Sequence, residues 1–217
     1  MTPDLTQVLN TLAHEIRTPL AVSQGYLTLL LDGRLSDAEL SRTAMEQTRQ
    51  ALGALATYCV DMGKIGALSE GGLKGIPVRR SASDFVMSVR GHSEVRHATF
   101  SGTAGSGQIE SPIASDLAHA VALVAQAAFD DARDSAHTVD LSSDHGSLAI
   151  LAGTADTVVA LRPGPGAPTA RPFNFAKGGK GLKLIWAAFV LDRHGVVTWA
   201  DAGARAAVGL RIPLMTT

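Results

Sequence analysis

One short segment, residues 11–22 (TLAHEIRTPLAV), places an imidazole beside a carboxylate within a helical pattern. A neutral imidazole such as that of His14 can act as a nucleophile, and the adjacent Glu15 can polarise one ring nitrogen or accept its proton. Pro19 follows five residues after His14 and has no amide hydrogen, so the carbonyl of Glu15 loses its helical partner at a cost of about 3 kcal/mol. These residues indicate a reactive histidine, although a surface histidine near a helix kink also fits the pattern.

The helical period predicts that His14 faces outward. Apolar residues recur at positions 5, 8, 9, 12, 16 and 20, and at 100° per residue positions 12 and 16 lie about 160° from the imidazole. Thr18, Ala21 and Gly25 share the face of His14. Because alanine and glycine have almost no side chain, this face predicts a shallow groove where the surface of another protein can approach the ring.

This segment belongs to a predicted helical hairpin. The first helix runs to about residue 31, and Asp32, Gly33 and Arg34 interrupt its pattern. A second helix is predicted from Ser36, with Glu39 completing a capping box, to the paired glycines at 71–72. Its apolar stripe comprises Leu40, Ala44, Gln47, Ala51, Leu55, Tyr58, Met62 and Ile65. Since an isolated hairpin leaves much of its stripe in water, we expect a homodimer that forms a four-helix bundle; the alternative is that the second half of the chain covers the stripe.

The second half of the chain has the pattern of an α/β sandwich. Predicted strands cover residues 97–102, 137–143, 147–153, 156–163, 196–201 and 208–213, and predicted helices cover 81–91, 115–132 and 181–193. This mixed order favours helices packed on one face of a sheet. We therefore expect two domains, residues 1–71 and residues 72–217, with a linker at 72–75.

Composition limits the classes of function. The formal net charge of -1 argues against a nucleic-acid surface, which needs a basic excess. The sequence contains no run of about 18 apolar residues, so no membrane span is predicted. The start of the sequence does not have the layout of a secretion signal. The single cysteine, Cys59, excludes an internal disulfide and fits a reducing compartment. We expect a cytoplasmic protein with neither a membrane nor a nucleic acid as partner.

The segment HEIRTPL, residues 14–20, resembles the phospho-acceptor box of the sensor histidine kinases of two-component systems, and it matches that family's pattern at every position. The resemblance implies that His14 carries a phosphoryl group and exchanges it with an aspartate of a response regulator. It also implies that Glu15 assists as a base and that Thr18 orients water when the regulator is dephosphorylated. We expect the response regulator to bind the face formed by Arg17, Thr18, Ala21 and Gly25.

Residues 75–217 resemble the ATP-binding domain of the same family, but the three boxes that would hold nucleotide are altered. In the first box, residues 122–127 (ALVAQA), alanine and Gln126 replace the family's asparagines. In the second, residues 162–166 (RPGPG), Gly164 and Gly166 remain, but Arg162 replaces the aspartate that accepts from adenine, and an arginine can only donate. In the third, residues 179–184 (GKGLKL), the first two glycines, Gly179 and Gly181, remain and a lysine replaces the last one.

These changes predict that no cofactor is bound. Gly179 follows Gly166 by only 13 positions, whereas the family's loop that closes over the nucleotide is generally longer. Lys180 and Lys183 lie near a glycine-rich helix start and could hold some other anion, or they are ordinary solvated lysines. The histidines other than His14 show no spacing typical of metal ligands, so no metal site is expected; they are His92, His97, His119, His137, His145 and His194.

Three functions are compatible with this pattern. The leading hypothesis is a histidine phosphotransfer protein of a phosphorelay, a histidine-kinase-like phosphotransferase in which His14 carries a phosphoryl group to or from an aspartate of a response regulator. The second is an ATP-dependent histidine kinase core, which would need ATP and Mg²⁺ despite its divergent nucleotide site. The third is a non-catalytic pseudokinase that binds a response regulator or a true kinase.

Overall fold

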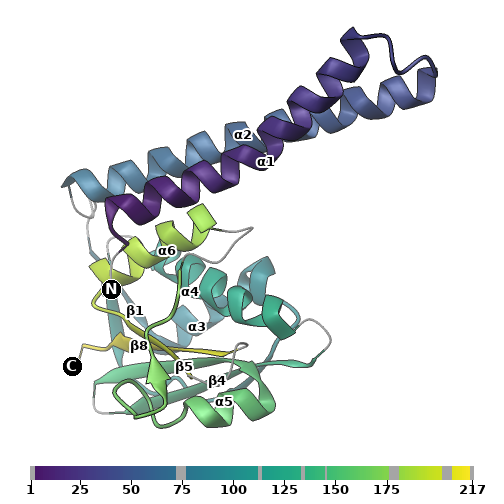
Figure 1. Cartoon of the computed structure of the whole chain (residues 1–217). Helices are drawn as coiled ribbons and strands as arrows, with labels where there is room; N and C mark the ends of the chain where they lie inside the picture. The colour runs from purple at the N-terminus through teal and green to yellow at the C-terminus, as the bar shows by residue number, and fades with distance from the viewer. Residues whose placement is uncertain are drawn as a thin grey trace.

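The computed structural model describes residues 3–71, 77–111, 114–132, 135–144, 146–175, 181–201 and 207–215. It consists of a long helical hairpin whose base packs against an α/β sandwich (Figure 1). The hairpin is formed by α1 (Leu5–Leu31) and α2 (Ala38–Gly71), and the predicted linker at 72–75 lies outside the described residues. No helix among the described residues is long and apolar enough to span a membrane.

Capping residues define the starts of both hairpin helices and the turn between them. Asp4 and Gln7 form a capping box at the start of α1, which ends at the cap residue Asp32 before Gly33 adopts a left-handed φ of 62°. At the start of α2, the carboxylate of Asp37 accepts from the amides of Glu39 and Leu40 at 2.7 and 3.1 Å. The predicted capping box of Ser36 and Glu39 is therefore wrong by one residue, because Asp37 supplies the stronger acceptor to the free amides of the first turn.

The sandwich contains two sheets and four α-helices among its described residues. The helices are α3 (Ala82–Gly91), α4 (Ala114–Phe129), α5 (Ala155–Leu161) and α6 (Gly181–Arg193), with short 3₁₀ helices η1 (Ser93–Val95) and η2 (Asp130–Ala132). The strands are β1 (Val78–Ser81), β2 (Thr99–Gly102), β3 (Gln108–Ser111), β4 (His137–Asp144), β5 (Ser147–Thr154), β6 (Ala170–Arg171), β7 (Val197–Asp201) and β8 (Ala207–Pro213). The larger sheet has the order β2-β4-β5-β8-β7-β6, in which only β2 and β4 are parallel, and β1 pairs with β3.

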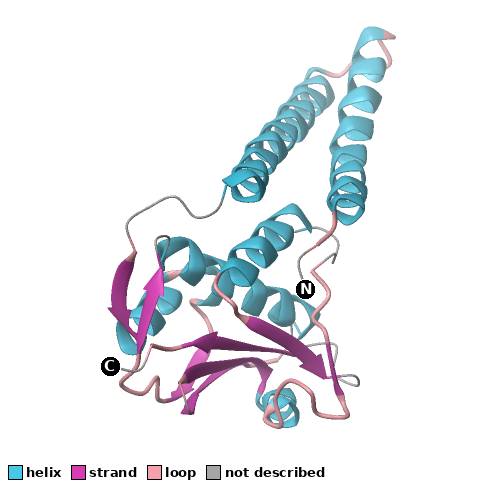
Figure 2. Ribbon diagram, turned by 90° about the vertical axis from the view of Figure 1, so that its left-hand side faces the viewer, coloured by secondary structure: helices cyan, strands magenta, loops and turns pink. Residues whose placement is uncertain are grey.

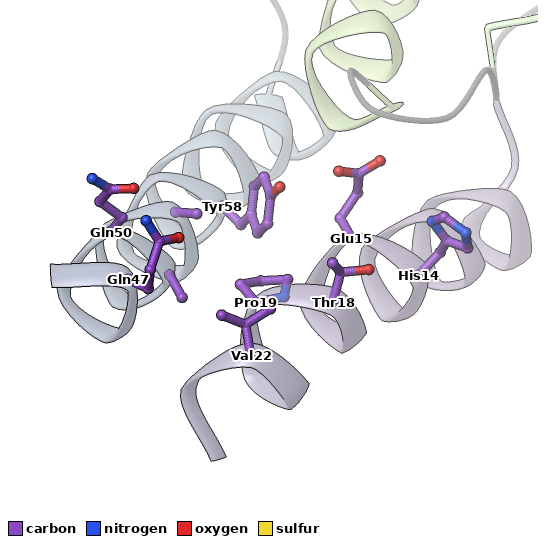
Figure 3. A pocket seen from close by; sticks show the side chains of 10 residues that line it. His14, Glu15, Thr18, Pro19, Val22, Gln47, Gln50 and Tyr58 are labelled. Atoms are coloured by element: carbon purple, nitrogen blue, oxygen red, sulfur yellow. The ribbon is translucent and has the colours of Figure 1, made fainter. Parts of the chain in front are cut away.

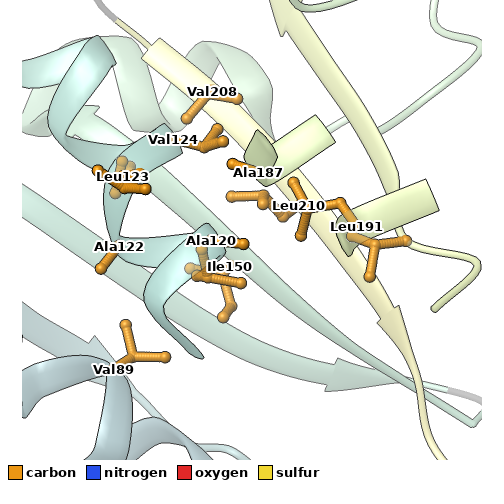
Figure 4. Packing of buried hydrophobic residues seen from close by; sticks show 14 of the residues in the cluster. Val89, Ala120, Ala122, Leu123, Val124, Ile150, Ala187, Leu191, Val208 and Leu210 are labelled. Carbon is orange, nitrogen blue, oxygen red and sulfur yellow. The ribbon is translucent and has the colours of Figure 1, made fainter. Parts of the chain in front are cut away.

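Helices cover both faces of the larger sheet. On one face, α4 contacts β5 and β8 and packs against α6, and buried side chains such as Ile150 and Leu210 lie between them (Figure 4). The next residue along β5, Leu151, faces the opposite side and packs with Val158 and Leu161 of α5. This alternation along a strand separates the two cores, and Figure 2 shows the helices on either side of the sheet.

Most predicted elements are present, with one reversal of type. Residues 156–163 were predicted as a strand, yet 155–161 form α5, which begins with a capping box in which Thr154 and Thr157 satisfy each other's backbone amides. This capping overrides the strand preference of the two adjacent valines. The prediction also missed β1, β3 and β6, which have at most four residues each and lack a regular apolar alternation.

The sandwich docks on the open end of the hairpin through α6. Val8 of α1 and Ile65 of α2 form a buried cluster with Leu182 and Ile185 of α6. In addition, the guanidinium of Arg193 donates to the carbonyl of Leu68 at 2.6 Å. This contact covers only the base of the hairpin and leaves large apolar side chains exposed along both helices; they are Leu5, Leu9, Leu20, Leu27, Leu31, Leu40, Met45, Leu52 and Val60.

Candidate functional site

His14 lies on the exposed surface of α1, as the helical phase predicts. Arg17, Thr18, Ala21 and Gly25 are exposed on the same helix, and a Cβ added at Gly25 would meet no atom within 4 Å. The surface beyond the imidazole is therefore low and open, which suits the close approach of another protein.

Glu15 lies in a different environment from its neighbour. Its side chain is buried, with 7% of the residue exposed, because consecutive helical residues point about 100° apart. Figure 3 shows Glu15 extending from α1 toward α6 while Tyr58 approaches from α2. Burial, followed by the charge of Glu15 and a hydrogen bond to it, raises the pKa of Tyr58. Glu15 thus joins the two hairpin helices in addition to adjoining His14.

A groove of about 380 Å³ runs between the two hairpin helices beside the imidazole. Pro19 is buried at its base, and the amides of Gln47 and Gln50 line it from α2. Its lining comprises His14, Glu15, Thr18, Pro19, Val22, Gln47, Gln50, Ala51, Ala54 and Tyr58. The α2 residues of this groove could not be assigned to the site from the sequence alone; the one signal was an amide at position 47 within an otherwise apolar stripe.

The residues of the first nucleotide box lie in or against the core of the sandwich. Ala122 is fully buried in the cluster around α4 (Figure 4). Gln126 is half-buried, and its amide donates to Asp130 one turn later on the same chain segment at 2.8 Å. Ala122 has no side-chain oxygen to offer a metal-bound triphosphate, and the side chain of Gln126 is held against Asp130 through its amide nitrogen.

The second box lies on the opposite face of the sheet from α4 and α6. Arg162 caps the end of α5, and its guanidinium is 3.3 Å from the carboxylate of Asp140. Asp140 stands between two residues of β4 that face α4, so its own side chain points to the α5 face. Gly164 and Gly166 follow with left-handed φ values of 81° and 84°. The structure therefore does not bring the second box together with the first.

The third box is represented by Gly181, the first residue of α6, and it is covered by the hairpin. A Cβ added at Gly181 would lie 2.3 Å from the methyl group of Thr11 and 3.3 Å from a carboxylate oxygen of Glu15. A carboxylate thus lies at the N-terminal end of α6, where the helix dipole favours negative charge. Lys183 is exposed, while Gly179 and Lys180 lie outside the described residues.

Residues 170–175, which follow the second box, are anchored in the core. Phe173 and Phe175 are buried and pack edge to face, with ring centroids 5.0 Å apart. Just before them, β6 pairs with β7. A segment whose aromatic side chains are part of the core cannot close over a ligand without giving up that burial.

A hairpin that carries an exposed histidine and docks on a mixed α/β sandwich is the architecture of a histidine-kinase-like protein. Residues 4–59 match the His Kinase A (phospho-acceptor) domain model, so this part of the chain is a phospho-acceptor domain of the two-component type. A comparison with curated proteins found no match.

Two solved structures, of AdeS and ShkA, share the fold of this chain. The histidine kinase AdeS of Acinetobacter baumannii is 16% identical with a TM-score of 0.54, over 94% of this chain and 98% of that one. Full-length ShkA, solved in complex with AMPPNP, is 17% identical with a TM-score of 0.55; the match covers 100% of this chain but only 47% of ShkA. A structure described as a bacterial phosphotransferase is 13% identical with a TM-score of 0.38, over 97% of this chain and 98% of that one.

Proposed function

We propose that this chain is a histidine phosphotransfer protein in which His14 carries a phosphoryl group to or from an aspartate of a response regulator, without binding ATP. The proposal rests on a contrast between the helical hairpin and the nucleotide boxes of the sandwich. The phospho-acceptor hairpin exposes His14 beside an open groove, whereas the first two boxes that would hold nucleotide lie in a core and on the opposite face of the sheet.

The transfer step needs only groups that the groove and the regulator supply. A lone pair on one ring nitrogen of His14 attacks the phosphorus of the regulator's aspartyl phosphate. An N–P bond forms, the P–O bond to the aspartate breaks, and the aspartate leaves as a carboxylate. The proton on the other ring nitrogen can pass to water or to Glu15, which lines the same groove. Thr18, exposed one turn after His14, is placed to orient a water molecule for hydrolysis.

The same surface defines the proposed partner. The regulator would contact Arg17, Thr18, Ala21 and Gly25, where small side chains let its aspartate come close to the ring. Two copies of the chain would join through the exposed apolar side chains of the hairpin to form a four-helix bundle.

Three features argue against ATP as the phosphoryl donor. Ala122 is apolar and has no ligand for a nucleotide-bound metal, and the side chain of Gln126 is held against Asp130 through its amide nitrogen. The N-terminal end of α6 is covered by Thr11 and Glu15. The segment before α6 has its phenylalanines in the core.

Transfer from a labelled regulator tests the proposal. A receiver domain carrying a radiolabelled aspartyl phosphate should lose its label to the wild-type protein within minutes and keep it in the presence of His14→Gln. Arg96→Gln, a change at an exposed residue of the sandwich, serves as the control and should transfer like the wild type. A His14→Gln protein that still accepted label would refute the proposal.

An autokinase is the second candidate, because the similar structure of ShkA is described in complex with AMPPNP. Titration calorimetry with ATP and Mg²⁺ separates the two candidates. We expect no saturable heat at millimolar ATP. Tight binding followed by label on His14 without any partner would favour the autokinase. A regulator that bound tightly but kept its label would instead indicate a pseudokinase.

A further inference from the structure

A group of three potential metal ligands lies on the sandwich, apart from the hairpin groove. His92 follows α3 as its cap, Glu94 is in η1, and His119 is on α4. One ligand atom from each lies within 4.8 Å of the other two, and all three residues are half-buried. Among the described residues this is the one group of three or more histidine, cysteine or acidic side chains gathered so closely.

We propose that His92, Glu94 and His119 bind a late first-row divalent metal ion, with Zn²⁺ the best match. Two imidazoles and one carboxylate are a ligand set that zinc commonly takes, with a fourth position left for water. Nε2 of His119 and Oε1 of Glu94 are 3.4 Å apart. Two ligand atoms about 2.05 Å from a tetrahedral zinc ion are about 3.3 Å apart, so this pair already has the spacing of one edge of the tetrahedron.

Neighbouring groups hold these ligands in place. The hydroxyl of Ser93 donates to Oε2 of Glu94 at 3.1 Å, which leaves Oε1 directed to the metal; such outer contacts orient ligands in known sites. The rings of His92 and His119 are parallel, with centroids 5.0 Å apart and an interplanar angle of 7°. The ring of His119 also packs against the ring of Trp186, with the two ring centroids 5.4 Å apart. The ligand atoms are close enough to share one ion, and because the two rings lie in parallel planes at least one imidazole must rotate to direct its lone pair at that ion.

The cluster joins two helices of the sandwich, because His92 caps α3 and His119 lies on α4. Bound metal would tie the turn after α3 to α4. Because Trp186 also packs against the buried cluster between α6 and the hairpin, the ion would stiffen the sandwich next to its contact with the phospho-acceptor domain.

The sequence alone does not reveal this site. His92 and Glu94 are two positions apart, and His119 follows only after 25 further residues, a spacing that matches no common metal motif. The end of α3 and the middle of α4 come together because α3, η1 and α4 contact one another in the fold.

Titration of the metal-free chain with zinc chloride tests the site. We expect one high-affinity Zn²⁺ per chain by calorimetry and a rise in Tm on adding zinc. The substitutions Glu94→Gln, which is nearly isosteric, and His119→Ala should each weaken binding at least tenfold and remove the rise in Tm. His97→Ala and His14→Gln, changes at exposed histidines, are the matched controls and should bind zinc like the wild type.

Two results would overturn the proposal. One is an absence of both heat and Tm change for the wild type at millimolar zinc. The other is high-affinity binding that survives Glu94→Gln and His119→Ala in chains whose circular dichroism shows a native fold. Neither result bears on transfer by His14, because no residue of this cluster belongs to the groove.

Discussion

At the residue scale, two adjacent side chains of α1 take separate roles. His14 is exposed to solvent, while Glu15 is buried where α1, α2 and α6 meet. The carboxylate is stabilised there by the N-terminal end of α6, and its charge acts on Tyr58. Glu15 therefore links the helix that carries His14 to the packing of the sandwich.

Removing the charge of Glu15 should change the pKa of Tyr58. Ionised Tyr58 would lie beside a carboxylate, which is one reason, after burial, that its pKa is raised. Glu15→Gln should lower that pKa toward the ordinary tyrosine value. Ultraviolet titration of the tyrosinate in a Tyr26→Phe background, where Tyr58 is the remaining tyrosine, measures the change. Equal titration curves with and without the substitution would show that the two groups do not interact.

The two glycines Gly181 and Gly25 should respond in opposite directions to the same change. Gly181→Ala drives a methyl group into Thr11 and should cost about 1–3 kcal/mol of unfolding free energy. Gly25→Ala meets no atom and should gain about 0.5–1 kcal/mol through helix propensity. Urea unfolding measures both.

A second substitution identifies the cause. Thr11→Ser removes the methyl group that would clash, so the double variant Thr11→Ser/Gly181→Ala should recover part of the loss. A Gly181→Ala chain as stable as the wild type would mean that α6 does not dock on α1 as described.

At the element scale, long amphipathic segments could be predicted and short ones could not. The hairpin, α4 and α6 follow from periodic apolar positions, because burial of a whole face favours one period. The type of α5 depends on the Thr154 cap, and β6 depends on pairing with β7. Likewise His14 and its open face could be predicted from helical phase, whereas Gln50 and Tyr58 enter the groove only through the packing of α2 on α1.

A half-buried histidine directly after α6, His194, should make stability depend on pH. Nδ1 of His194 is 2.8 Å from the carbonyl of Val190, and its Nε2 is 2.5 Å from Oγ of Ser111 on β3. Burial lowers the pKa of His194. Since the unfolded chain then binds a proton more readily, this stabilising contribution is full above about pH 6.5 and is lost as the pH falls below it.

Unfolding free energies at about pH 7.5 and about pH 5.5 check this dependence. The wild type should lose stability between the two values, and His194→Gln should lose less. His97→Gln, at an exposed position, should behave like the wild type. An identical loss in the wild type and His194→Gln would assign the pH dependence to other groups.

At the scale of the whole molecule, the hairpin has more apolar surface than the sandwich covers. Exposed or half-buried side chains on α1 recur at Leu9, Ile16, Leu20, Leu27 and Leu31, and these spacings of seven and four residues are those of a helical seam. A second copy that packed along this seam would complete the core and leave both imidazoles outside.

Charge placed in the seam should prevent the proposed dimer. Leu27 is 45% exposed and lies well away from the docked end of the hairpin. Leu27→Glu should shift the mass measured by light scattering from a dimer to a monomer, since an unpaired carboxylate cannot be buried in the bundle. Met87→Glu, a similar change on an exposed apolar residue of α3, should leave the dimer intact.

The most direct measurement is the occupancy of His14 by phosphate in two charging reactions run side by side. One contains ATP and Mg²⁺, and the other contains a phosphorylated receiver domain, with phosphohistidine measured by mass spectrometry under basic conditions. We expect phosphate on His14 only in the reaction with the receiver, and none in His14→Gln. Phosphate on His14 in the reaction with ATP alone would contradict the proposal.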